Sequence, residues 1–468
     1  MVTEGFQRQG GASDASTWEI SPYTVFGLLG FTFYLAWMFM LFASPTVSPE
    51  HVRETLLGPS FASQDSFPRL TLLLALCASL FTAWRLSDAL SSKRGTALLV
   101  IGGLLLNTLA FAMLQIAAGH IVVLHIAWAM TGISQACAIL LWSTFLSSIG
   151  DVRILMFISL SIAAAATVAL LMSLLKPFAA HWIGFALFPL TMACFCYIHY
   201  RLTGFSKALE VRARVSDERS SIPLKSALSV MLYSVIIGFA LCFIVGSGAG
   251  IFGAAAAATA VICAGATVAL DSALFHRITE SLLIRFHLPF LVIGIAPLFF
   301  TNLTAQIIAC AFMLYFFMII YIINLSALSE HVRIDHLSAI RVFGYGRGGN
   351  ALGVAFGSVA YYFAFHESFP FAGGEQSSTT AILLLLFGLL VFGASFVFED
   401  HYPFSSERRL SETNTNGMAH ALPANDLRAL SSLNARPPEQ LGQETQGGFW
   451  RRRCMALADA CDLSPQER

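Results

Sequence analysis

The residues of this chain that are suited to binding chemistry are a few polar side chains inside long apolar stretches. They carry amide, imidazole or guanidinium groups, and the candidates are Asn107, Gln115, His125, Gln135, Arg347 and Asn350. A polar group in an apolar interior costs free energy unless it finds a hydrogen-bond or charge partner. The pattern therefore predicts that these side chains contact a small-molecule ligand in a central cavity.

Catalytic chemistry is not indicated by any residue pattern in this sequence. It contains no Ser/His/Asp or Cys/His arrangement and no group of residues with the spacing of metal ligands. Seven of the nine cysteines lie inside apolar stretches and form no CxxC pair, which is typical of cysteines that fill space in a core. We therefore predict that the protein is not an enzyme and holds neither a metal nor a cofactor.

The stretch GYGRGG at 344–349 matches the G-x-G-x-x-G pattern of dinucleotide sites. Such a site needs a β-strand before it and a βαβ unit around it, whereas here the pattern opens a long apolar segment. We interpret these glycines as packing residues instead. Gly349, Gly353 and Gly357 recur every four residues, which predicts close contact with a neighbouring helix.

The elements that position the candidate residues are predicted to be helices that cross a lipid bilayer. The 468 residues are 56% hydrophobic and 12% charged, whereas soluble domains are about 25% charged. The apolar runs are continuous rather than alternating, which favours helices over barrel strands. Twelve runs reach spanning length, near residues 22–44, 69–85, 96–117, 121–147, 154–175, 179–200, 226–246, 251–275, 282–300, 303–325, 341–365 and 378–398.

The distribution of basic residues sets the predicted orientation. With the N-terminus inside, fourteen Lys and Arg residues fall in inner loops and three, Arg53, Arg69 and Lys176, fall in outer loops. Because basic residues are enriched on the cytoplasmic side, both termini are predicted to be cytoplasmic. Arg347 then lies just inside the inner boundary. Its side chain either contacts a ligand or gate, or extends to the interface or pairs with an inner-loop acid. For the amides and His125, hydrogen bonding to a neighbouring helix is the alternative.

The domain organisation follows from the longest inner loop, which divides the membrane part into two six-helix halves. The predicted parts are an N-terminal tail at 1–21, a first half at 22–200, the central loop at 201–225, a second half at 226–398, a linker at 399–448 and a terminal segment at 449–468.

A short repeat after the second and the eighth predicted helix supports an internal duplication. DALSSKR and DSALFHR each place basic residues five and six positions after an aspartate. The matching positions are Asp88 and Asp271, Lys93 and His276, and Arg94 and Arg277. Parallel repeats of this kind characterise one large transporter architecture.

Residues 22–398 resemble the major facilitator superfamily. The resemblance consists of twelve helices, the 6+6 division, the long central inner loop and the acidic-and-basic signature between helices two and three. Trp84 and Ser91 stand where the family's signature has glycines on either side of the acid. The resemblance implies an all-α integral membrane bundle with both termini in the cytoplasm.

The character of the chain changes at residue 399. The segment 399–448 is polar and rich in Pro, Gly, Ser and Asn, which predicts a flexible cytoplasmic linker. The last residues form a helix start, with Ser464 as N-cap, Pro465 at the first position and Glu467 at the third. A stable helix needs about 12 residues. We therefore expect the chain to stop at the first helix of a further domain.

The closing FWRRRCMALADACDLSPQER resembles the start of a LuxR-type helix-turn-helix domain. The matching residues are Leu463, Ser464, Pro465, Glu467 and Arg468. Joined to the membrane part, this segment resembles a group of bacterial regulators that carry a facilitator-like sensor in the cytoplasmic (inner) membrane. The resemblance implies ligand-controlled transcription regulation, with DNA as partner and homodimer formation in the intact form, and with the DNA-reading helix absent here.

Two functions are consistent with these patterns. The first is the membrane-embedded sensor part of a LuxR-type regulator that binds an unknown small molecule, and the alternative is a major-facilitator-type secondary transporter of a small solute. No Asp or Glu lies in the middle third of any predicted helix. Because proton-driven carriers usually hold an embedded carboxylate or histidine, this absence favours a sensor or a uniporter over an ion-coupled carrier.

Overall fold

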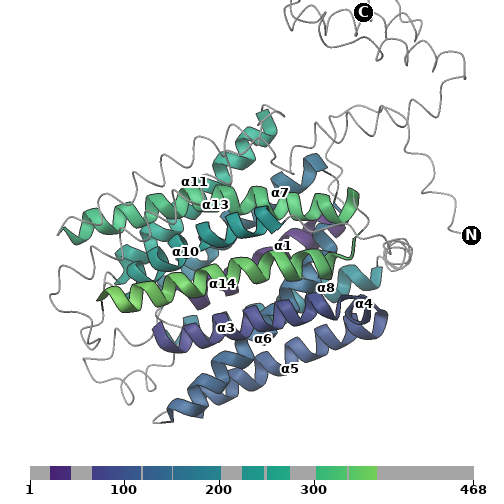
Figure 1. Cartoon of the computed structure of the whole chain (residues 1–468), viewed down its shortest axis with the longest axis horizontal. Helices are drawn as coiled ribbons and strands as arrows, with labels where there is room; N and C mark the ends of the chain where they lie inside the picture. Colours follow the sequence, from purple (N-terminus) through teal and green to yellow (C-terminus); the bar gives the residue numbers. More distant parts are fainter. Residues whose placement is uncertain are drawn as a thin grey trace, which may run out of the picture. The chain divides into compact units, whose positions relative to one another are not determined.

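The computed structural model describes residues 22–43, 66–116, 120–149, 151–175, 177–201, 224–246, 250–274, 302–334 and 337–365. Every regular element in these ranges is a helix, and the long helices run alongside one another as a bundle (Figure 1). They are α1 (Pro22–Ala43), α3 (Ser66–Arg85), α4 (Ser87–Leu90), α5 (Lys93–Ile116), α6 (Ile121–Leu146), α7 (Asp151–Ser173), α8 (Pro177–Arg201), α10 (Leu224–Gly246), α11 (Gly250–Leu274), α13 (Leu303–Ile334) and α14 (Ala339–Phe365).

Length and composition suit these helices to a bilayer. Among the described helices, seven are long and apolar enough to cross a membrane, namely α1, α5, α6, α7, α8, α11 and α13. Helices α3 and α10 contain shorter apolar stretches at Leu70–Arg85 and Val230–Ile244. Helix α14 is continuous, but its apolar sequence is interrupted by glycines and by Arg347 and Asn350. The glycines determine its packing, and Arg347 and Asn350 line the cavity described below.

Ten of the predicted apolar segments fall in the described part of the chain, and each coincides with a long helix. The segments 282–300 and 378–398 lie outside the described residues, as do the tail 1–21, the linker 399–448 and the terminal segment 449–468. The count of twelve helices and the cytoplasmic position of both termini therefore stay predictions.

Several helix boundaries differ from the apolar segments, and two of them show the reason. Helix α13 continues to Ile334, nine residues beyond the end of the segment at 303–325, and α5 begins at Lys93 rather than at residue 96. In both cases the additional turns are polar and include Glu330 and Arg94. Hydropathy shows where a helix leaves the hydrocarbon core, whereas backbone hydrogen bonds continue into the polar region.

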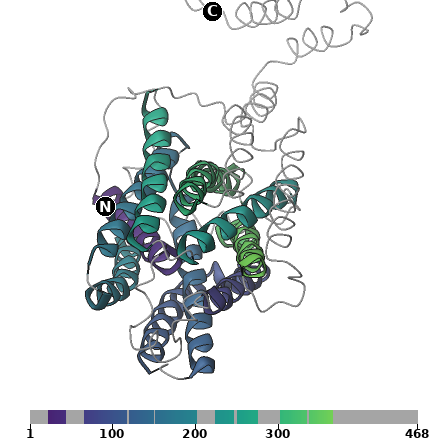
Figure 2. The ribbon, with the colours of Figure 1, turned by 90° about the vertical axis from the view of Figure 1, so that its left-hand side faces the viewer.

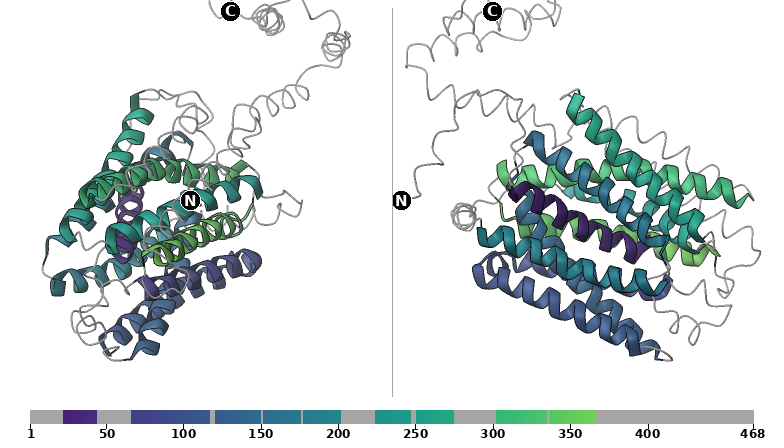
Figure 3. Two further views of the ribbon diagram at one scale, coloured as in Figure 1. Left: turned by 60° about the vertical axis from the view of Figure 1, so that its left-hand side comes forward. Right: turned by 180° about the vertical axis from the view of Figure 1, so that it is seen from behind.

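The most extensive contacts between the two halves are made by two pairs of helices. Helix α3 packs along α14, and α7 packs along α11. Figures 2 and 3 show the same bundle from other sides, with α3 and α14 remaining side by side. In the order of the predicted segments, α3 and α11 are each second in their half, and α7 and α14 are each fifth. This reciprocal pairing of second with fifth helices is what two parallel repeats related by an axis along the membrane normal produce.

Glycines let α14 approach α10 closely. A Cβ built on Gly357 would lie 2.7 Å from the backbone nitrogen of Phe239, and one on Gly353 would lie 2.7 Å from the Cβ of Ser234. Gly238 of α10 faces the backbone of Val354 in the same way. The predicted close-packing role is confirmed for Gly353 and Gly357.

A second pair of glycines on α14 faces the other half of the bundle. A Cβ on Gly344 would lie 2.9 Å from the carbonyl oxygen of Leu80, and one on Gly348 would lie 3.1 Å from the ring of Phe81. The Cys77 thiol also donates to the Gly348 carbonyl oxygen at 3.6 Å. Glycines of α14 therefore contact both halves, with one pair directed at α10 and the other at α3.

The first half is held by a short hydrogen-bond chain in its core. The Trp142 indole of α6 donates to the Thr191 hydroxyl of α8 at 2.9 Å, and that hydroxyl donates to the Gly30 carbonyl oxygen of α1 at 2.6 Å. Phe31 packs against the Trp142 ring with centroids 5.7 Å apart. Because Trp142 is only 1% exposed, satisfying its N–H group is a condition for burying this large side chain.

The glycine contacts predict a stability difference between two identical substitutions. Gly357→Ala places a methyl group against the backbone of α10 and is expected to lower the free energy of unfolding by about 1–3 kcal/mol. Gly102→Ala on α5 has no atom within 4 Å of the new Cβ and is expected to be neutral or to stabilise by up to about 1 kcal/mol, since alanine favours helix. Unfolding of both purified variants in detergent micelles measures the difference. Equal effects would contradict the packing role of Gly357.

Candidate ligand-binding cavity

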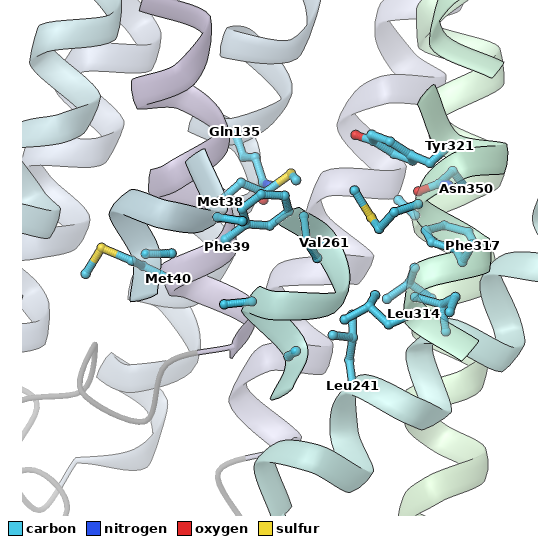
Figure 4. Close-up of a pocket in the computed structure, with 18 of the residues that line it drawn as sticks. Met38, Phe39, Met40, Gln135, Leu241, Val261, Leu314, Phe317, Tyr321 and Asn350 are labelled. Atoms are coloured by element: carbon cyan, nitrogen blue, oxygen red, sulfur yellow. The ribbon is translucent and has the colours of Figure 1, made fainter. Parts of the chain in front are cut away.

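A cavity of about 120 Å³ lies between the two halves. It is lined by α1, α3, α6 and α7 of the first half and by α10, α11, α13 and α14 of the second. Figure 4 shows its walls, with Met38, Phe39 and Gln135 facing Phe317, Tyr321 and Asn350 across the space. Apolar side chains make up most of the lining, and the described residues that line it include no Asp, Glu or His.

Arg347 brings a positive charge to this cavity. Its side chain is 6% exposed, and its guanidinium carbon lies 4.5 Å from the centroid of the Tyr321 ring on α13. Within the described part of the chain, the Nη1 atom has no hydrogen-bond partner. Arg347 is thus buried beside the cavity rather than extended to the membrane interface.

Gln135 is the polar group that the first half contributes. It is 0% exposed, and neither its Nε2 nor its Oε1 atom makes a hydrogen bond of standard geometry to a described residue. The neighbouring polar groups on α6 behave differently, since Ser134 donates to the Thr131 carbonyl oxygen at 2.8 Å and Thr131 to that of Ala127 at 2.9 Å. Gln135 alone of these three side chains is left with unsatisfied atoms, and it lines the cavity.

Tyr34 of α1 lies among these groups. Its hydroxyl is beside the Gln135 amide and within electrostatic range of Tyr321 and Arg347, and it donates weakly to the Met38 sulfur at 3.9 Å. Four helices from the two halves thus bring polar atoms together at the seam between the halves.

Asn350 is anchored to the second half. Its Nδ2 atom donates to the Ser234 hydroxyl of α10 at 3.0 Å, and that hydroxyl donates to the Val230 carbonyl oxygen at 2.6 Å. Asn350 lies almost one helical turn after Arg347 on α14, so the two side chains reach the same cavity. The contact with Ser234 orients Asn350 in advance of any ligand.

The other candidates lie elsewhere. Asn107 is buried at a second, smaller cavity of about 40 Å³, which Trp37, Phe111 and Thr131 also line. His125 shares a hydrogen bond of 2.7 Å with the Thr71 hydroxyl of α3, which is the helix-contact alternative. Gln115 is next to the last residue of α5 and does not line either cavity. Of the six candidates, the structure brings Gln135, Arg347 and Asn350 together, and their role as ligand contacts stays a prediction.

The repeated signature is only partly described. Asp88 is exposed on α4, and Lys93 and Arg94 are exposed in the first turn of α5. Asp271 belongs to the last turn of α11. The other predicted residues lie outside the described part of the chain, namely His276, Arg277, Leu463, Ser464, Pro465, Glu467 and Arg468.

Tyr321, Tyr34 and Ser234 were not predicted from the sequence. A tyrosine in an apolar helix has the same appearance as any packing aromatic, and a helical serine usually bonds to its own backbone. Neither type is marked by composition or spacing as a cavity residue. The contacts of Tyr321 with Arg347 and of Ser234 with Asn350 identify them.

Two solved structures that share this fold are transporters. The human organic anion transporter MFSD10 (TETRAN) matches with a TM-score of 0.56 and 15% identity over 81% of this chain and 100% of its own. The major facilitator superfamily proton:xylose symporter XylE, solved with 6-bromo-6-deoxy-D-glucose, matches with a TM-score of 0.57 and 12% identity over 81% of this chain and 95% of its own. No family model matches the chain. No curated protein matches it either.

These similarities concern the fold. Together with the apolar helices they define the chain as a multi-pass helical membrane protein with the major facilitator fold. In transporters built from such paired repeats, substrate sites lie at the interface between the repeats.

The unsatisfied amide predicts an unusual mutational effect. Gln135→Met removes two buried polar atoms that make no hydrogen bond of standard geometry to a described residue, and is expected to raise the free energy of unfolding of the ligand-free protein by about 1–3 kcal/mol. Thr71→Val breaks the hydrogen bond to His125 and is expected to lower it by about 1 kcal/mol. Unfolding in detergent micelles compares the two. A loss of stability in Gln135→Met would show that the amide is satisfied in the protein.

Proposed function

We propose that the protein transports a small solute across the membrane by exposing the central cavity alternately to the two sides. The observation that carries this proposal is that the cavity is lined by both halves, with Gln135 contributed by the first half and Arg347 and Asn350 by the second. A solute held by both halves is released when they tilt relative to each other, which is the motion by which paired repeats achieve alternating access. The transport activities in the names of the two structural neighbours support the proposal.

The composition of the cavity favours facilitated movement without proton coupling. Its described lining contains no carboxylate and no imidazole, so it lacks the groups that take up and release protons in most coupled carriers. We therefore propose a uniporter that moves its solute down the concentration gradient.

The experiment is exchange of labelled small solutes by the purified chain reconstituted in vesicles. Ala258→Phe places a ring in the cavity that Ala258 lines and is expected to abolish the exchange. Ala255→Phe on the same helix adds the same ring away from the cavity lining and is expected to leave exchange intact. Equal inhibition by both variants, or saturable exchange in neither variant nor the unsubstituted chain, would contradict the proposal.

A second candidate function is ligand sensing for a LuxR-type regulator. The lining without carboxylate or imidazole favours it, because such a cavity can bind a ligand without ion coupling. The terminal residues Leu463, Ser464, Pro465 and Glu467 support it by their resemblance to the start of the helix-turn-helix domain. In this proposal the ligand stabilises one tilt of the halves, and the intact form binds DNA accordingly.

Removal of the terminal segments distinguishes the two candidates. A chain that ends at residue 398 is expected to exchange solute at the rate of the full chain if the protein is a transporter, because residues 399–468 lie outside the twelve predicted helices. A sensor would bind its ligand with and without these residues and would exchange it in neither form. Vesicle exchange combined with equilibrium binding measures both properties on the same preparations.

A further inference from the structure

The charge on Arg347 has no counter-charge in the described structure. Arg347 is only 6% exposed, and the described lining of the cavity contains no carboxylate. The two predicted segments outside the described residues, 282–300 and 378–398, contain no Asp or Glu in their sequences. The membrane part of the chain therefore offers no acid in the middle of a segment that could pair with this guanidinium.

The contact with Tyr321 does not compensate for this burial. A cation over an aromatic ring gains a modest electrostatic energy, whereas removing an unpaired charge from water costs considerably more. The Nη1 atom also lacks a hydrogen bond to any described residue. The guanidinium can therefore offer both its positive charge and an N–H hydrogen-bond donor to a ligand that enters the cavity.

We propose that the cavity binds a small organic anion, whose carboxylate or similar negatively charged group pairs with Arg347 and whose body is apolar. The inference rests on the proposed function in that it names the solute class of the same cavity. Guanidinium is the side-chain group best matched to a carboxylate, since it donates two parallel N–H groups.

Gln135 supplies an independent observation from the opposite half. Its side chain is fully buried and neither amide atom makes a hydrogen bond of standard geometry to a described residue, so Nε2 is a second, neutral donor for an anion. The Tyr34 hydroxyl beside it lies within electrostatic range of Arg347. An anion between Gln135 and Arg347 would connect the two halves through its own hydrogen bonds.

The side chains that line the cavity indicate the character of the uncharged part of the ligand. Met38, Val261, Leu314 and Phe317 surround the space (Figure 4), so the ligand body is apolar. The volume of about 120 Å³ is close to that of an engineered apolar cavity of about 150 Å³ that holds benzene. A sugar of similar size would leave most of its hydroxyls facing hydrocarbon, at a cost that this lining does not offset.

The test compares acids with their neutral amides on the purified full chain in detergent micelles. Isothermal titration is carried out with benzoate and benzamide and with hexanoate and hexanamide. At least one of the acids is expected to bind about 10- to 100-fold more tightly than its amide, which is the range of one charge-assisted hydrogen bond. Equal affinity within both pairs, including absence of measurable binding by both acids, would overturn the inference.

Two substitutions on one helix assign the preference to Arg347. Arg347→Gln is expected to remove the preference for the acid while keeping the affinity for the amide, and Arg347→Lys is expected to keep part of it. Arg341→Gln removes an exposed charge from the same helix and is expected to change nothing. A preference that survives Arg347→Gln, or is lost in Arg341→Gln, would overturn the assignment.

The result separates this inference from the proposed function. Acid binding that depends on Arg347 without exchange in vesicles would support the anion site and contradict transport. Exchange of a neutral solute that is blocked by Ala258→Phe, with no preference for either acid, would support transport and overturn the anion site.

Discussion

The close approach of α14 to helices of both halves is the constraint on which the cavity depends. Gly344 and Gly348 face α3 across the seam, while Gly353 and Gly357 face α10 in the same half. Since the glycines add no side chain of their own at these positions, α14 lies close to α3 and to α10 over residues 344–357. The same helix carries Arg347 inside the first glycine pair, between Gly344 and Gly348, so the packing that joins the halves also brings the positive charge to the space between them.

The distribution of satisfied and unsatisfied polar groups gives this space its chemistry. Most described hydroxyls inside the helices donate to a carbonyl oxygen three or four residues earlier, as Ser134 and Ser234 do, and they need no further partner. Both amide atoms of Gln135 and the Nη1 atom of Arg347 make no hydrogen bond of standard geometry to a described residue. A buried polar atom without a partner costs free energy. A ligand that supplied the missing partners would gain binding energy from these groups. It would also stabilise the conformation in which the two halves are close together.

The spanning helices were predictable from hydropathy, because each is a property of one continuous segment and the ten in the described part coincide with apolar runs. The candidate site was predictable only in part. Gln135 and His125 are polar residues ten positions apart on α6, yet one lines the cavity and the other bonds to Thr71 of α3. Their types and spacing do not distinguish these outcomes. The direction each side chain takes depends on the rotation of α6 against its neighbours, which hydropathy does not report. Tyr321 was missed for the related reason that a buried tyrosine has the composition of a packing residue.

The sequence by itself determined the all-helical character of the membrane part, the absence of acidic residues from the middle of its predicted spans, and the four-residue spacing of Gly353 and Gly357. Each of these is a local property that composition or short spacing expresses completely. Only the tertiary structure decided that Gln135 of the first half and Arg347 of the second meet at one cavity and that Asn107 belongs to another. The physical reason is that convergence between segments distant in sequence depends on how closely helices approach and how they are rotated. Both are set by side-chain packing across the whole bundle rather than by any single helix.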